Sequence, residues 1–247
     1  MPAPKQKYNE LVDVINTIAQ QQPVDQVAVA RVRAEAKRLL NSDPASAHVV
    51  LGILAGLEGK VDAVREHFRV ALEVSPSARW ARSNHVNALV SVAEFRKAAR
   101  LAAVYSAEAP LDVELLRLAL GLNMTVGSFR QAKTLSDRLR LLLGAAEEAV
   151  QDVDQVLKIM KDESIVQEEI ERAVDVAIEI ARGRKLSPDG SQVTVENDDD
   201  RFLSIELKTR VPASEIADLN FELANLLAAE PSFSRPDKVI ISFAPMK

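Results

Sequence analysis

The chain has 247 residues, of which 47% are apolar and 4% aromatic, and its formal net charge is −5. This apolar content is enough to bury a core in one large or two modest domains, and it excludes wholesale disorder. The acidic balance argues against a general nucleic-acid binder, because such a protein needs a basic surface. The absence of cysteine excludes disulfides, thiolate metal sites and a cysteine nucleophile.

The N-terminal segment is polar. Residues 1–22 contain no continuous apolar run of the kind that forms a secretory signal. Nowhere does the chain approach the roughly 20 apolar residues that a membrane span requires. We therefore expect a soluble, cytoplasmic protein without membrane contact. Residues 8–21 and 24–40 are expected to form a first pair of helices, ended by the polar segment 41–44.

A repeat of 34 residues runs through the middle of the chain. The segments 59–64, 93–98 and 127–132 share one order: small, polar, bulky apolar, two variable residues, then small or apolar. Each segment is expected to be a tight turn that opens the second helix of a pair.

The ends of the repeated units follow the same period. Pro76, Pro110 and Gly144 recur with a spacing of 34 residues, and proline and glycine both stop helices. The period therefore predicts three antiparallel helix pairs over residues 45–146.

The first unit carries the residues of a known repeat pattern, namely Leu51, Gly52, Gly59, Phe68, Ala71 and Pro76. In these positions the chain resembles the tetratricopeptide repeat family. The later units keep fewer of the signature residues, Ala98 and Pro110 in the second and Gly127 and Ala132 in the third. The resemblance implies an α-solenoid whose first helices line a concave groove, and this groove holds an extended peptide or a helix of a partner protein.

The resemblance also indicates which side chains face that groove. They are Trp80, Ser83, Asn84 and Asn87 in the middle unit, Arg117 and Met124 in the next one, and Val49 and Ile53 in the preceding one. Asparagine amides can bond a peptide backbone, Arg117 can bind a carboxylate, and Trp80 can serve as an apolar anchor. The alternative is that Trp80 packs in the core and the two asparagines lie on a solvated surface.

One specialised role within the family is not expected. Relatives that bind the C-termini of chaperones hold a carboxylate with lysine and asparagine in the groove of the first unit. This chain has Val49 and Ile53 at those places.

Two further helices are expected before the composition changes. Residues 147–160 place apolar side chains on one helical face. Ser164 and Gln167 suggest a capping box that opens a helix ending near Arg182. These helices would form a degenerate fourth unit or a cap, which a solenoid needs to cover its last apolar face. We therefore predict a helical repeat domain over residues 1–183.

Residues 184–247 are predicted to form a small α+β module of order β-β-α-β. Alternating apolar residues around Val193 and Ile205 flank the polar turn 197–200, as in a β-hairpin. Pro212 begins a helix, and residues 239–243 form a third strand. Such a sheet has two edges and one open face, which suggests a second contact or a homodimer.

One catalytic alternative deserves a test. Glu206 and Lys208 would lie on the same strand face, which resembles the acidic-x-lysine motif of metal-dependent nucleases of the restriction type, with Asp189 or one of Asp198, Asp199 and Asp200 as partner. The pattern is commonplace on strands. No histidine pair or phosphate loop is evident by spacing. The main hypothesis is a scaffold or adaptor that binds a protein or peptide, with no enzymatic activity and no cofactor.

Overall fold

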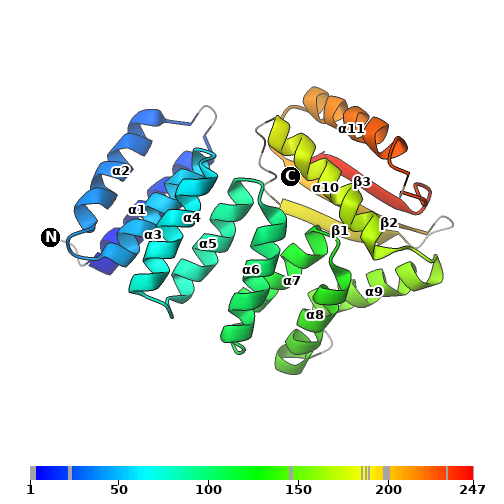
Figure 1. Cartoon of the computed structure of the whole chain (residues 1–247), viewed down its shortest axis with the longest axis horizontal. Helices are drawn as coiled ribbons and strands as arrows, with labels where there is room; N and C mark the ends of the chain where they lie inside the picture. Colours follow the sequence, from blue (N-terminus) through cyan, green and yellow to red (C-terminus); the bar gives the residue numbers. More distant parts are fainter. Residues whose placement is uncertain are drawn as a thin grey trace. The chain divides into compact units, whose positions relative to one another are not determined.

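The structure is a computed structural model that describes residues 4–21, 24–144, 147–184, 186, 188, 190–196, 201–231 and 233–246. These residues form eleven helices and three strands (Figure 1). The prediction of consecutive helices followed by a small α+β segment is confirmed. Contacts divide the chain into two compact units, Met1–Val92 and Ala93–Lys247.

The first unit is entirely helical. Helix α3 lies at its centre, with α1 and α5 in contact with it and with α2 and α4 packed against it. The five helices are α1 (Pro4–Ala19), α2 (Gln26–Leu39), α3 (Pro44–Leu57), α4 (Val61–Val74) and α5 (Arg79–Ser91).

Close contact between α3 and α4 depends on small residues. Phe68 of α4 is fully buried, and a Cβ built at Gly52 of α3 would lie 2.7 Å from its ring. Only glycine leaves room for the ring, so the two helices approach closely at this point. Asp43 begins α3 by accepting a hydrogen bond from the N–H of Ser46 at 3.1 Å.

The second unit contains six helices and the sheet. The elements are α6 (Phe95–Glu108), α7 (Val113–Thr125), α8 (Phe129–Leu143), α9 (Glu148–Asp162), α10 (Gln167–Gly183), β1 (Gly190–Glu196), β2 (Phe202–Thr209), α11 (Ala213–Ala228) and β3 (Val239–Pro245). Helix α7 packs against both α6 and α8, and α8 packs against α9. The boundary predicted at residue 183 thus lies inside this unit, and α5 and α6 of the second repeat belong to different units.

The turns between paired helices share one backbone conformation. Gly59, Ala93 and Gly127, each 34 residues apart, all have φ between 57° and 73°. Ser164, between α9 and α10, has φ 55°. After three of these turns, the N–H of Lys60, Ser128 or Ile165 donates to the carbonyl five residues earlier, at 2.8–2.9 Å. This is a C-terminal capping geometry. The 34-residue period therefore corresponds to a repeated turn.

The predicted capping box at the start of α10 is wrong. Val166 occupies the N-cap position and makes no side-chain cap bond. Ser164 belongs to the left-handed turn after α9 instead. The Gln167 side chain accepts a hydrogen bond from the N–H of Arg130 at 2.9 Å, which ties α10 to α8.

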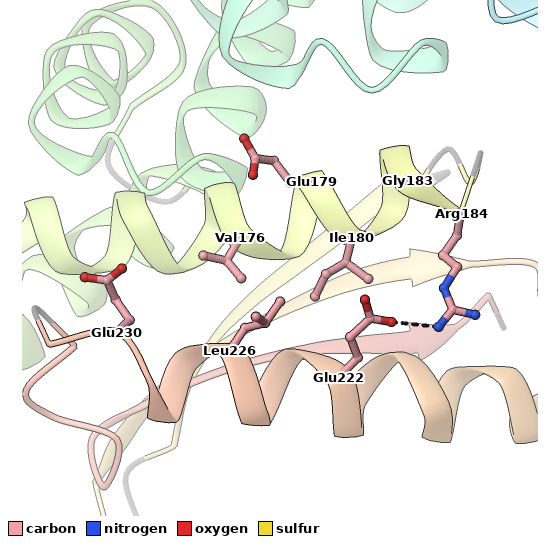
Figure 2. A pocket seen from close by; sticks show the side chains of 8 residues that line it. All are labelled: Val176, Glu179, Ile180, Gly183, Arg184, Glu222, Leu226 and Glu230. Carbon is pink, nitrogen blue, oxygen red and sulfur yellow. Dashed lines mark hydrogen bonds and ion pairs between the residues drawn. The ribbon is translucent and has the colours of Figure 1, made fainter.

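The sheet has the order β1-β2-β3. Strands β1 and β2 form the predicted antiparallel hairpin, with Val193 opposite Ile205, and β3 runs parallel to β2 with Ile241 beside Ile205. Helices α9, α10 and α11 contact the strands, and α10 and α11 lie side by side in front of the sheet in Figure 2. The predicted turn 197–200 lies outside the described residues.

The outer edge of β3 is closed by a side chain. Asn220 of α11 donates from Nδ2 to the carbonyl of Phe243 at 3.0 Å and accepts from the Phe243 N–H at 2.7 Å. Along β3, the backbone groups of even-numbered residues, such as Lys238 and Met246, bond to β2. The backbone N–H and carbonyl of Phe243 therefore point away from β2. This edge is therefore not free at Phe243, contrary to the two open edges that the sequence predicts.

None of the described helices is both long and apolar enough to cross a membrane.

Candidate functional site

Helix α5 carries four of the predicted groove residues on one face, because their spacing of three and four matches the helical period. Asn87 is exposed, while Trp80, Ser83 and Asn84 are half-buried. The ring of Trp80 lies 4.8 Å from the ring of Tyr8, measured between centroids, with the planes tilted by 53°. Trp80 therefore packs on α1 and still presents part of its surface to solvent.

Asn84 joins this contact as a hydrogen-bond donor. Its Nδ2 donates to the hydroxyl of Tyr8 at 3.0 Å and to the carbonyl of Trp80 at 2.7 Å. Burial raises the pKa of Tyr8 to about 12, with the bond from Asn84 acting in the opposite direction. The phenol therefore stays protonated at neutral pH. Tyr8 belongs to this surface, although sequence reasoning missed it, because nothing local links residues 76 positions apart.

The two candidates on α3 differ in exposure. Ile53 is half-buried, whereas Val49 is 0% exposed. The Val49 side chain therefore packs inside the first unit, so we do not retain it as a contact residue. All four residues on the α3 turn from Val49 to Gly52 are buried, since α3 is in contact with four helices.

The two candidates on α7 line a cavity of about 180 Å³ in the second unit. Arg117 and Met124 face it from α7, opposite Asp152 of α9 and Val193 of β1. Met124 is only 7% exposed. Thr125, at the end of α7, is hydrogen-bonded to Ser191 of β1. The chain's own strand thus lies against the helix face where the resemblance places a partner.

Arg117 is already paired with carboxylates. Its Nη2 lies 2.9 Å from Glu147 and its Nη1 lies 3.2 Å from Glu114. The hydrogen bond with Glu147 is the largest cause that raises the pKa of Arg117. Because exposed ion pairs of this kind contribute little to stability, a partner's carboxylate can replace them at low cost. The predicted contact residues on α3 and α5 thus belong to the first unit, and those on α7 belong to the second.

Two of the three histidines meet within the first unit, which their sequence spacing does not indicate, and the third packs on a phenylalanine. Nδ1 of His48 on α3 lies 3.1 Å from Nδ1 of His67 on α4. The ring of His85 stacks on Phe68 at 4.8 Å between centroids. Burial lowers the pKa of all three, that of His85 to about 4. Neutral imidazoles are therefore favoured, and one of the facing nitrogens can donate to the other.

Glu206 and Lys208 lie on the same face of β2, as predicted, and they are ion-paired with each other. The residues beside Glu206 in the sheet are Gln192 and Ser242. No carboxylate therefore faces Glu206 from the neighbouring positions of the described strands. Asp189 and Asp198 to Asp200, the partners weighed for a nuclease, lie outside the described residues. Within the part of the chain that the structure describes, no group of three His, Cys, Asp or Glu side chains could hold a metal ion.

A larger cavity, of about 570 Å³, lies between α10 and α11. Figure 2 shows Val176, Ile180 and Leu226 pointing into the space between the two helices, and Arg184 paired with Glu222 across one end of it. We call this space the α10–α11 groove. The sequence gives each helix an apolar face but does not reveal that two helices separated by a β-hairpin lie side by side.

Comparisons with known proteins found no match to this chain. The chain matches no family model, and neither a curated protein nor a solved structure matches it.

Proposed function

We propose that this protein is a scaffold or adaptor that binds a polypeptide partner through the first helices of its helix pairs. The observation that carries the proposal is the face of α5. There, the exposed Asn87 lies two helical turns from Trp80 on the same face, and the ring of Trp80 packs against Tyr8.

The chemistry of this face suits a peptide backbone. An exposed amide offers both a donor and an acceptor, and Asn87 supplies one on the same helix face as the half-exposed indole of Trp80. Tryptophan is a frequent anchor at protein interfaces. Because the indole of Trp80 already packs against the ring of Tyr8, whose hydroxyl accepts a hydrogen bond from Asn84, binding loses little side-chain freedom at this anchor.

The second unit supports the same function by analogy within the chain. Strand β1 is an extended segment that packs against α7, the first helix of the third repeat. An extended chain therefore fits against a first helix of this protein. In the adaptor, α5 offers the comparable surface to a partner chain.

The proposal predicts the effect of single substitutions on affinity. Asn87→Ala should weaken the complex with a partner, isolated by affinity capture with the full chain, by about 1–3 kcal/mol. Asn225→Ala is the matched control, because Asn225 is exposed on α11. Calorimetric titration gives the affinities, and thermal melting checks the fold. An unchanged affinity for Asn87→Ala, or equal losses for both variants, would contradict the proposal.

A further inference from the structure

The α10–α11 groove is apolar at its base and charged at its rim. Val176 and Ile180 of α10 and Leu226 of α11 point into it, and Leu226 is 46% exposed. Glu222 and Glu230 stand on the α11 side. An exposed leucine between two packed helices leaves apolar surface in water, which a partner helix can cover.

Negative charge is concentrated on these two helices. Between them, α10 and α11 carry eight carboxylates and two arginines, a net charge of −6, whereas the entire chain carries −5. Helix α11 contains no basic residue. On the far side of α10, Glu171 and Glu168 pair with Arg96 and Arg130. The charged residues that line the groove are Glu179, Glu222, Glu230 and Arg184, three carboxylates and one guanidinium, so the lining has a net charge of −2.

The groove already binds one guanidinium group. Nη2 of Arg184, at the end of α10, lies 2.7 Å from a carboxylate oxygen of Glu222, and the two side chains are 49% and 40% exposed. A pair this exposed contributes little to stability. Arg184 therefore marks the place and geometry in which an arginine or lysine of a partner can bind Glu222.

Charge also decides between the conceivable occupants. A second copy would bring the same excess of carboxylates, Glu179, Glu222 and Glu230 against the single cation Arg184, to the groove, and like charges repel at close range. An anionic membrane is repelled for the same reason. A basic segment is attracted, and its apolar side chains can cover Leu226.

We propose that the α10–α11 groove binds a basic amphipathic helix of a partner protein. Leucine-like side chains on one face of that helix contact Val176, Ile180 and Leu226. Lysine or arginine on its flank pairs with Glu222, in exchange for Arg184. The groove belongs to the second unit and the α5 face to the first.

The probe is a labelled synthetic helix of about 16 residues, with leucines spaced by three and four residues and lysines or arginines beside them. One control peptide replaces each basic residue by glutamate. A second keeps the composition but permutes the order, so that the leucines no longer share a face. Fluorescence anisotropy with the full chain measures binding. We expect the basic amphipathic peptide alone to bind, and to bind less tightly as salt is raised.

Variants of the full chain locate the contact. Leu226→Glu should weaken peptide binding about tenfold, and Glu222→Gln by about threefold or more. Arg184→Gln should strengthen it about threefold, because the internal competitor is removed. Leu141→Glu, at a residue 87% exposed on α8, and Glu148→Gln on α9 are the apolar and charge controls.

Several outcomes would overturn the proposal: no binding of the basic peptide, equal binding of a control peptide, or no effect of Leu226→Glu. Weaker binding by Arg184→Gln would also contradict the exchange at Glu222. Asn87→Ala should leave peptide binding unchanged, so failure here is distinguishable from failure of the α5 face.

Discussion

At the scale of single residues, two glycines on first helices have opposite surroundings. A Cβ at Gly52 would lie 2.7 Å and 2.9 Å from two carbons of the Phe68 ring, whereas a Cβ at Gly121 of α7 would meet nothing within 4 Å. Replacement of glycine by alanine should therefore have opposite effects on stability at the two positions.

Gly52→Ala should destabilise the first unit by about 1–3 kcal/mol, because the fully buried Phe68 ring has little freedom to move. Gly121→Ala should be neutral or stabilising by up to about 1 kcal/mol through helix propensity. Urea unfolding followed by Trp80 fluorescence reports the first unit, and circular dichroism reports the whole chain. A stabilised Gly52→Ala variant would show that the two helices separate more easily than the packing indicates.

The buried imidazole of His85 makes the first unit sensitive to acid. Its pKa falls from 6.5 to about 4 on folding, so the unfolded chain binds more protons between these values. The stability that the first unit gains by keeping the His85 imidazole neutral is fully present above pH 6.5 and is lost as the pH falls toward 4. Between pH 7 and pH 5, the loss should be roughly 1–2 kcal/mol.

His85→Phe keeps an aromatic ring against Phe68 and removes the titration. The variant should lose less stability than the natural chain when the pH is lowered from 7 to 5, as judged by Trp80 fluorescence in urea. Some dependence should remain, because burial also lowers the pKa of His48 and His67. An equal loss of stability in both proteins would mean that protonation of His85 does not destabilise the first unit.

At the scale of elements, local signals predicted most of the chain. The helices α3 to α8 follow from a 34-residue period, because each turn needs a small residue at positive φ and each helix end needs a stop. Ala93 adopts the same positive φ as the two glycines, so the turn forms at this position of the repeat even without glycine. Alternation likewise predicted β1 and β2.

Features that depend on tertiary approach could not be predicted. The contact of Tyr8 with Trp80, the facing nitrogens of His48 and His67, and the α10–α11 groove all join segments distant in sequence. The burial of Val49 was missed for a related reason: α3 is in contact with four other helices, and these contacts bury the Val49 side chain.

The edge of β3 offers a test at this scale. Asn220→Ala removes two hydrogen bonds to Phe243 and should cost about 1–3 kcal/mol. It should also expose the strand edge and promote self-association. Asn225→Ala, on the exposed side of the same helix, is the control for helix propensity. Urea unfolding and light scattering measure the two effects, and a monomeric Asn220→Ala variant of natural stability would rule out the edge function.

At the scale of the whole molecule, the two units carry surfaces of different chemistry. The first unit presents an amide and an indole on one face of α5, which suits an extended backbone. The second presents an acidic groove with an apolar base, which suits a basic helix. An adaptor needs at least two such surfaces, and they can select partners independently because their chemistry differs.

The central claim is that α5 contacts a partner polypeptide, and site-specific photo-crosslinking tests it most directly. A photoreactive amino acid is placed at Asn87, and in a matched variant at Ala34, which is exposed on α2. The account predicts that illumination in the native host joins one distinct partner to position 87 and not to position 34. Equal crosslinking at both positions, or none at position 87, would contradict it.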